Sequence, residues 1–132
     1  MTSECFLQVR SYECDSYGHV NNANYLNYLE YARHELMKNI GFDYPKALNA
    51  GYGIFTARIE IDYKKPAVTD DRLAIKTWPI KKGAVSGILA QEICRGDDIL
   101  AQAKVTWAFV DLKTGTPVKI PKEYDVPGLS PQ

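Results

Sequence analysis

The sequence predicts an α+β protein in which one long helix packs against an antiparallel sheet. Between residues 24 and 40 apolar side chains recur every three or four positions, which is the spacing of one helical face. From residue 55 onward apolar and polar side chains alternate, as in strands with one buried face. One long helix followed by a run of strands is the order of an α+β fold. At 132 residues the chain is long enough for one core, so we expect a single domain over residues 1–132.

The helix is expected over residues 24–40. Its apolar face consists of Tyr25, Leu29, Ala32, Leu36 and Ile40, and Leu26 and Met37 widen it. The asparagines among residues 21–24 supply the N-terminal cap, and Gly41 followed by Phe42 predicts the C-terminal stop. A wide apolar face indicates a helix that is buried on more than one side.

Residues 6–12 alternate and predict a first strand, whereas residues 45–53 are rich in turn formers and predict a loop. Four further strands are expected over residues 55–63, 73–80, 84–95 and 99–111, with turns at residues 81–83 and 96–98. Four of the seven prolines follow Thr116, so the C-terminal tail is predicted to be extended coil on the surface.

The composition gives no indication of nucleic-acid or membrane binding. Sixteen basic and sixteen acidic residues cancel, and no apolar run approaches the roughly twenty residues of a membrane span. Residues 1–5 have neither the basic nor the apolar region of a secretory signal. Cys5, Cys14 and Cys94 lie at no metal-ligand spacing. We therefore expect a cytoplasmic protein with reduced thiols and no metal or cofactor.

The most informative segment is D-S-Y-G-H-V-N-N-A-N-Y, from Asp15 to Tyr25. It places a carboxylate, a turn glycine, a histidine and three asparagines just before the helix. A helix start presents unpaired N–H groups and a partial positive charge, which can polarise a carbonyl or hold an anion. A carboxylate beside it is the minimal equipment for hydrolysing an activated acyl group. Single Asp and Asn residues usually only cap turns, but their density and order here favour a site.

The segment resembles the active-site segment of hotdog-fold thioesterases of the 4-hydroxybenzoyl-CoA and acyl-ACP thioesterase type. The acyl-ACP pattern Asp-x-x-x-His-Val-Asn-Asn-x-x-Tyr is matched at Asp15, His19, Val20, Asn21, Asn22 and Tyr25. The family's following Tyr-x-x-(aromatic)-x-Glu-x-Ala-Arg is matched at Tyr25, Tyr28, Glu30, Ala32 and Arg33. Tyr17 stands where the plant enzymes usually have Asn, so the role of that Asn does not transfer. The resemblance implies a sheet wrapped round a central helix and hydrolysis of acyl-CoA or acyl-ACP.

Three residues are expected to be catalytic. Asp15 would act either as a general base on water or as a nucleophile that forms a mixed anhydride, and the sequence leaves both open. The backbone N–H of Asn22, or of a neighbour in the first turn, is the expected donor to the thioester carbonyl. His19 either hydrogen-bonds Asp15 or the thioester oxygen, or it is simply a turn histidine. Cys14 is more simply a packed thiol than a nucleophile.

Four more residues of the motif are expected at the substrate site: Tyr17, Gly18, Asn24 and Tyr25. Gly18 is the turn glycine of the motif. Asn24 is most simply a residue of the helix start that orients the preceding loop.

Farther along the predicted helix, Glu30 lies three residues before Arg33, which predicts a surface ion pair. Some hotdog thioesterases take their carboxylate from the helix, so Glu30 is the alternative to Asp15, whereas His34 is expected to be structural. The pairs Lys64-Lys65 and Lys81-Lys82 lie at a strand end and a turn. Such pairs are usually solvated. The resemblance also implies that one of the two pairs, either Lys64 and Lys65 or Lys81 and Lys82, binds CoA phosphates or an acidic carrier protein.

Two other functions remain open from the sequence: a hotdog dehydratase or hydratase, and a non-catalytic acyl-binding protein. The order of Asp15 and Tyr25 fits thioesterases better than dehydratases. A sheet wrapped round one helix leaves free edges, which favour pairing between chains. We therefore expect a two-fold homodimer, or a tetramer built from two of them, with each site formed by two chains.

Overall fold

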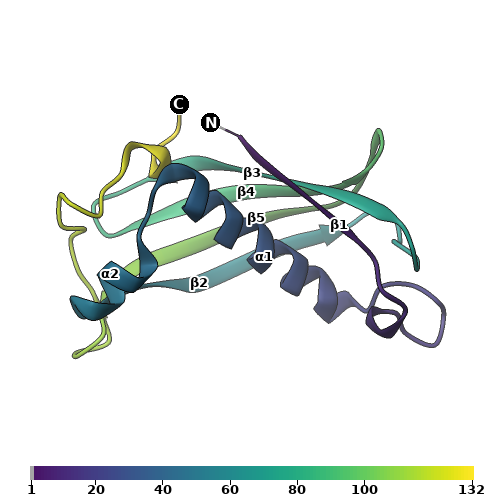
Figure 1. Cartoon of the computed structure of the whole chain (residues 1–132), viewed down its shortest axis with the longest axis horizontal. Coiled ribbons are helices and arrows are strands. Elements are labelled where there is room, and N and C mark those ends of the chain that lie inside the picture. Colours follow the sequence, from purple (N-terminus) through teal and green to yellow (C-terminus); the bar gives the residue numbers. More distant parts are fainter. Residues whose placement is uncertain (1) are drawn as a thin grey trace.

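The computed structural model describes residues 2–132 and has the predicted α+β architecture. One long helix, α1, lies across one face of a curled antiparallel sheet (Figure 1). The elements in chain order are β1 (Ser3–Gln8), the 3-10 turn η1 (Ser11–Glu13), α1 (Asn22–Ile40), α2 (Tyr44–Asn49), β2 (Tyr52–Tyr63), β3 (Arg72–Lys82), β4 (Ser86–Arg95), β5 (Asp98–Asp111), β6 (Thr116–Pro117) and the 3-10 turn η2 (Pro127–Leu129). The loop before α1 lies at the opposite end of the molecule from α2 (Figure 1).

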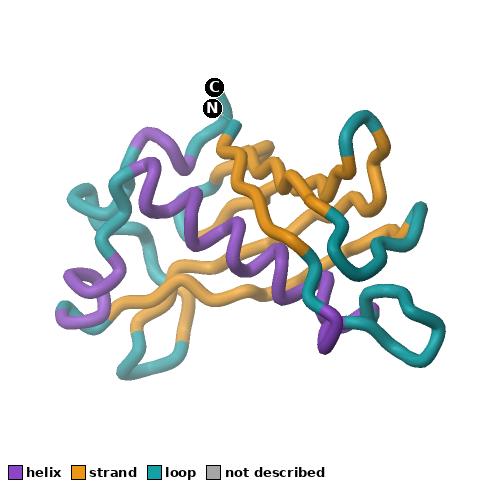
Figure 2. Tube along the Cα trace, turned by 45° about the vertical axis from the view of Figure 1, so that its right-hand side comes forward, coloured by secondary structure: helices purple, strands orange, loops and turns teal. Residues whose placement is uncertain are grey.

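The strands lie in the order β1-β3-β4-β5-β2, with β6 added beside β5. All pairs are antiparallel, and β3, β4 and β5 follow one another as hairpins. Figure 2 shows α1 running across these strands, with the two termini close together. The two edges of the sheet are therefore β1 and β2, the strands that flank α1 in the sequence.

Helix α1 begins two residues earlier than the sequence predicts. Asn21 is its N-cap, and the Asn21 side chain accepts a hydrogen bond from the Ala23 N–H at 2.9 Å. The predicted stop is confirmed, because Gly41 adopts a left-handed conformation with φ of 80° and the Phe42 N–H donates to the Met37 carbonyl. No helix among residues 2–132 has both the length and the apolar character needed to cross a membrane.

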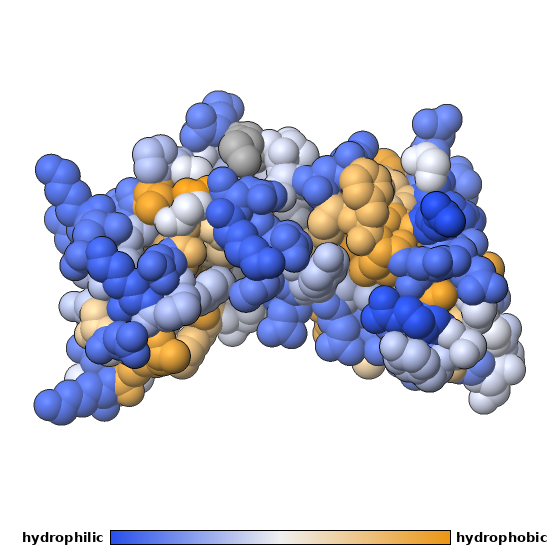
Figure 3. Space-filling view, viewed as in Figure 1, coloured by the Kyte–Doolittle hydropathy of each residue, from blue (hydrophilic) through white to orange (hydrophobic). Residues whose placement is uncertain are grey.

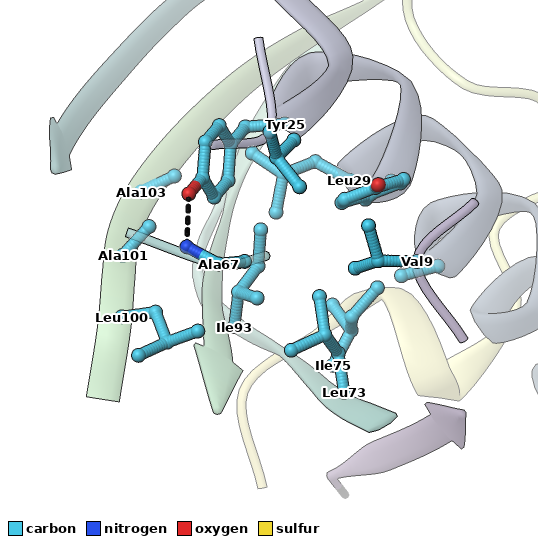
Figure 4. Packing of buried hydrophobic residues seen from close by; sticks show 13 residues of the cluster. Val9, Tyr25, Leu29, Ala67, Leu73, Ile75, Ile93, Leu100, Ala101 and Ala103 are labelled. Atoms are coloured by element: carbon cyan, nitrogen blue, oxygen red, sulfur yellow. Dashed lines mark hydrogen bonds between the residues drawn. The ribbon is translucent and has the colours of Figure 1, made fainter. Parts of the chain in front are cut away.

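The helix divides the core into two clusters. The first lies under the N-terminal half of α1, where Tyr25 and Leu29 pack against Val9, Ile75 and Ile93 (Figure 4). The Tyr25 hydroxyl accepts a hydrogen bond from the Ala67 N–H at 3.0 Å. The second cluster lies under the C-terminal half and contains Leu36, Met37, Trp107, Phe109 and Leu129. Both ends of α1 are therefore held by burial of large apolar side chains, the main stabilising term in folding.

Strand β2 differs from its prediction as a half-buried strand. None of its residues is fully buried, and Phe55 is 50% exposed. Two features explain this: β2 has a neighbour on one side only, and a bulge at Ala57 interrupts its pairing with β5 between Thr56 and Arg58. The other edge is also partly apolar, because hydrophobic side chains gather over β1 (Figure 3) and Phe6 of that strand is exposed.

The loop predicted for residues 45–53 is wrong, because α2 occupies most of it. Asp43 caps this helix by accepting from the Lys46 N–H at 3.0 Å, and Pro45 lies in its first turn. Proline is tolerated there because its missing N–H would have no partner in the first turn of a helix. Pro45, one of the turn formers that predicted a loop, therefore lies at the beginning of a helix.

The C-terminal tail is not the surface coil that its prolines predict. Ile120, Tyr124 and Leu129 are buried in the second core cluster. Gly128 lies against Ile40, where a Cβ atom would come within 2.4 Å of an Ile40 methyl carbon. The tail thus covers the C-terminal end of α1, and its prolines fit because much of it needs no ladder hydrogen bonds.

Strand boundaries differ in two places that matter for the site. The first strand ends at Gln8, and η1 replaces its predicted second half. Lys81 and Lys82 lie within β3 instead of forming the turn, which follows them at residues 83–85.

Candidate active site

The loop that carries Asp15 is a short hairpin closed at its base. Cys14 and Val20 form an isolated β-bridge, and the Asp15 N–H donates to the His19 carbonyl at 2.8 Å. At its tip the Gly18 N–H donates to the Asp15 carbonyl at 3.0 Å, and Gly18 has φ of 78°. This left-handed conformation favours glycine, which explains the residue at this position. Residues 15–19 are all exposed, and Tyr17 at the tip is 85% exposed.

The two carboxylate oxygens of Asp15 have different surroundings. Oδ1 accepts hydrogen bonds from the Tyr17 N–H at 2.9 Å and, less closely, from the His19 N–H at 3.4 Å. Oδ2 accepts from no donor in the described part of the chain. The loop therefore fixes the direction of the carboxylate through one oxygen and leaves the other available for chemistry.

A buried carboxylate, Glu13, holds the base of this loop. Its Oε1 accepts from the Arg10 N–H and the Tyr28 hydroxyl, both at 2.8 Å, and its Oε2 pairs with the Arg10 guanidinium at 2.9 Å. Its backbone carbonyl accepts from the Asn21 N–H at 2.8 Å and from the Asn24 side chain at 2.9 Å. Burial, followed by the hydrogen bond to Glu13, raises the pKa of Tyr28 well above its usual range.

Glu13 was not among the predicted site residues. It connects the loop to the first and second turns of α1, so it sets where Asp15 lies relative to the helix start. The signal that could have found it is the three-residue spacing from Arg10 to Glu13, which is that of a capping box. Asn24 orients the loop through the same carbonyl, the simple role that its position predicts.

At the start of α1 the backbone N–H of Asn22 is a free donor. The Ala23 N–H is taken by the Asn21 side chain, and the Asn24 N–H donates to the Asn21 carbonyl at 2.8 Å. The Asn22 N–H donates to no group within residues 2–132. This unbonded N–H carries the positive end of the helix dipole, so it can polarise a carbonyl oxygen or hold an anion.

A cavity of about 270 Å³ opens between the loop and the end of β2. Its walls are formed by Asp15, His19, Val20, Tyr25, Tyr63, Lys64, Lys65 and Pro66. The structure thus brings five of the predicted site residues to one place, and it adds Tyr63, which sequence reasoning missed. Tyr25 contributes a wall, since it is buried and its hydroxyl is occupied by the Ala67 N–H.

The two lysines of this cavity differ in their surroundings. Lys65 pairs with Asp98 at 2.9 Å, and both side chains are about half exposed. Lys64 has no carboxylate within ion-pair distance in the part of the chain described. Lys64 is therefore the cation of this cavity that is available to an anion.

Lys81 and Lys82 lie at the other end of the sheet. Lys82 pairs with Gly87, which pairs with Trp107, whereas Tyr63 pairs with Ala101 on the same strand. Six residues of β5 separate these positions, or roughly 20 Å. The Lys82 ammonium is bound to Asp125 at 2.9 Å, so it anchors the C-terminal tail. Within one chain this pair does not reach the Asp15 cavity.

Glu30 lines a different cavity of about 370 Å³, beside the middle of α1. Its walls are formed by Glu30, Arg33, His34, Met37, Tyr44, Ile54, Thr56, Leu89 and Trp107. The predicted Glu30–Arg33 ion pair is wrong, because the Arg33 guanidinium instead donates to the Gln91 side chain at 3.0 Å. Burial lowers the pKa of Arg33 and raises that of Tyr44. His34 stacks on Tyr44 with ring centres 5.8 Å apart, which is a packing role.

The Cys14 thiol contacts a neighbouring segment of the chain. Its sulfur lies 3.3 Å from the Thr69 hydroxyl, on the side of the loop that contacts the β2–β3 connection. The partly buried packing of this thiol agrees with its sequence interpretation.

Known proteins resemble this chain over most of its length. The family model of the thioesterase-like superfamily matches residues 9–126. The long-chain acyl-CoA thioesterase FadM of Escherichia coli is 38% identical over 111 residues, which are 82% of this chain and 83% of FadM. The acyl-acyl carrier protein thioesterase ATL3 of Arabidopsis thaliana is 33% identical over 73 residues, 55% of this chain and 38% of ATL3.

The likeness extends to three dimensions. The crystal structure of the probable thioesterase YbaW of Escherichia coli superposes with a TM-score of 0.81 at 33% identity, covering 92% of each chain. These matches confirm the resemblance carried by the segment from Asp15 to Tyr25 and by the helix that follows it. The chain belongs to the thioesterase-like superfamily and is a thioesterase with the hotdog fold.

Proposed function

We propose that this protein hydrolyses acyl thioesters of CoA or acyl carrier protein at the Asp15 cavity. The observation that carries the proposal is that two groups of the loop-helix junction have no partner within residues 2–132. Asp15 lines the cavity, and Asn22 contacts it through Tyr63, whose hydroxyl bonds the Asn22 carbonyl. The two groups are the free Oδ2 of Asp15 and the unbonded N–H of Asn22. One is a base or nucleophile and the other a donor to an oxyanion, the two groups that acyl transfer requires.

In the proposed reaction the thioester oxygen accepts the Asn22 N–H, and its carbon becomes more electrophilic. Asp15 then either takes a proton from water, whose oxygen adds to that carbon, or adds directly and forms an anhydride that water opens. In both cases the C–S bond breaks and the thiolate leaves with the bonding electrons. A thiolate is a good leaving group, so no strong general acid is required. His19 lines the cavity and would contact the acyl or thiol side of the substrate.

The carrier is proposed from the relatives and from Lys64. FadM is named as an acyl-CoA thioesterase and ATL3 as an acyl-acyl carrier protein thioesterase. Both carriers end in a phosphopantetheine thiol, and the free ammonium of Lys64 at the cavity edge suits its phosphate. A panel of acyl-CoA and acyl-ACP thioesters, assayed for thiol release, decides between the carriers and gives the acyl preference.

Asp15→Asn is the direct test. We expect it to lower kcat by at least about a hundredfold, the low end of what a positioned base contributes, with the melting temperature unchanged. Glu30→Gln is the matched control. It also neutralises one carboxylate, but this carboxylate belongs to α1 and lines the other cavity. Near wild-type turnover by Asp15→Asn, with loss of turnover in Glu30→Gln, would move the reaction to the Glu30 cavity.

The assembly is proposed to be a two-fold homodimer that pairs its sheets through β2, with a tetramer as a further step. Support comes from the long, exposed β2 edge and from its apolar side chains, such as Phe55. The Asp15 cavity is open to solvent in one chain, so a second chain would supply its missing wall. Light scattering at micromolar concentration should give at least twice the 14.9 kDa chain mass. An active monomer would contradict this proposal.

A further inference from the structure

Tyr63, the last residue of β2, joins the edge of the sheet to the start of α1. Its hydroxyl donates to the Asn22 carbonyl oxygen at 3.0 Å. Its ring packs edge-on against Tyr25, with centres 5.2 Å apart and planes at 72°. Tyr25 is itself fixed by burial and by the Ala67 N–H (Figure 4). The phenol of Tyr63 is thus held in direction although its side chain is 48% exposed.

The hydrogen bond from Tyr63 is additional to those that the helix needs. In an α-helix the carbonyl of the first residue is already bonded by the N–H four residues later. A carbonyl oxygen has two lone pairs, so it can accept a second donor. The Tyr63 bond therefore satisfies no orphan group of the backbone, and its effect is to tie the first turn of α1 to β2.

This bond completes a clamp on one peptide group. The peptide between Asn22 and Ala23 is held at its oxygen by Tyr63 and at its N–H by the Asn21 side chain at 2.9 Å. Because a peptide group is planar and rigid, two bonds at its opposite ends restrict how far it can shift or tilt. The Asn22 N–H, which has no partner within residues 2–132, belongs to the preceding peptide and is joined to the clamped one through the Asn22 Cα, so motion of the clamped peptide would change its direction.

We infer that Tyr63 is a positioning residue for the oxyanion donor, acting through the Asn22–Ala23 peptide. The inference rests on the proposed function, because the expected fall in kcat assumes that the Asn22 N–H is the donor to the oxyanion. Tyr63 then contributes to kcat, although it lies outside the motif and its packing against Tyr25 does not need its hydroxyl. It also makes the ordering of the first turn of α1 depend on the last residue of β2.

The test is Tyr63→Phe, which keeps the ring contact with Tyr25 and removes only the hydroxyl. Complete loss of an oxyanion donor costs about 10²–10³ in kcat, so a donor that remains but loses its alignment should cost roughly tenfold. KM for a short acyl-pantetheine thioester should stay within about twofold, because the donor acts mainly in the transition state. Tyr31→Phe is the matched control, since Tyr31 is an exposed tyrosine of α1 whose hydroxyl makes no hydrogen bond within residues 2–132.

A second measurement does not depend on turnover. In free protein, ¹⁵N relaxation should show lower order parameters at Asn22 and Ala23 in Tyr63→Phe than in wild type, with no change in Tyr31→Phe. A tenfold fall in kcat with greater motion at these two amides supports the inference. An unchanged kcat, or a lower melting temperature alone, overturns it.

The two proposals fail in different ways. If wild type hydrolyses no thioester, the proposed function fails, and relaxation alone decides whether Tyr63 orders the donor. If wild type is active and Asp15→Asn abolishes the activity, but Tyr63→Phe matches Tyr31→Phe in both measurements, only the positioning role of Tyr63 is overturned.

Discussion

The two cavities beside α1 contain similar residue types but differ in what those residues are bonded to. Each has a carboxylate, a cation and a tyrosine: Asp15, Lys64 and Tyr63 in one, and Glu30, Arg33 and Tyr44 in the other. In the Asp15 cavity the ammonium of Lys64 and one oxygen of Asp15 have no protein partner in the described chain. In the Glu30 cavity Arg33 is bonded to Gln91, and Tyr44 is stacked with His34.

The position on the helix explains this difference. Asp15 belongs to the loop that leads into the first turn of α1, where backbone N–H groups have no partner in the helix. Glu30 lies in the middle of α1, where every N–H is bonded to the preceding turn, so that cavity offers no main-chain donor to a carbonyl. We therefore expect polar substitutions near Asp15 to change kcat, and those near Glu30 to change mainly stability.

After Asp15→Asn, the largest effect is expected from Glu13→Leu. It removes the acceptor of the Tyr28 hydroxyl and the Arg10 N–H, so it should destabilise the fold by about 2 kcal/mol. Because the loop base loosens, kcat should also fall by roughly tenfold. Urea unfolding and steady-state kinetics measure the two effects. Glu13→Gln, which keeps an acceptor oxygen, should recover most of kcat, and a wild-type kcat in Glu13→Leu would show that this network does not position Asp15.

A purely structural effect is expected from Gln91→Leu, since Gln91 is the partner of Arg33 in the other cavity. Gln91 is fully buried, and it bonds Arg33, the Leu29 carbonyl and the Thr77 hydroxyl. Its loss leaves these groups unpaired and should cost about 1–3 kcal/mol in the free energy of unfolding. At temperatures where the variant is folded, kcat should remain within about twofold. A tenfold fall in kcat would instead make the Glu30 cavity part of the active site.

The smallest effect is expected from the surface lysines. Lys64→Glu should raise KM for acyl-CoA by about threefold at low salt, and the effect should fade as salt screens the charge. The same variant should leave KM for a short pantetheine thioester without phosphates unchanged. Lys81→Glu is the control at the far end of the sheet. Equal KM changes in both variants would indicate general charge repulsion and no phosphate site at Lys64.

Sequence reasoning predicted the main helix, which the structure confirms, and the loop that carries Asp15 as the candidate site. The segment from Asp15 to Tyr25 is short and continuous, so the loop, the cap and the helix start form from neighbours in the chain. Gly41 ends the helix for an equally local reason, its left-handed backbone. The residues missed at the site, Glu13 and Tyr63, act through bonds whose partners the sequence pattern does not reveal.

The chain by itself therefore determined the local features: the helix and its two ends, the alternation of the later strands, and the carboxylate placed before a helix start. Only the tertiary structure decided which strands became edges, that the proline-rich tail covers α1, and that Lys64 reaches the cavity while Lys82 anchors the tail. The physical reason is the separation in sequence between the residues that interact. Hydrogen bonds within one turn depend on adjacent residues, whereas edges, cavities and the Tyr63 clamp depend on pairing between segments some forty residues apart.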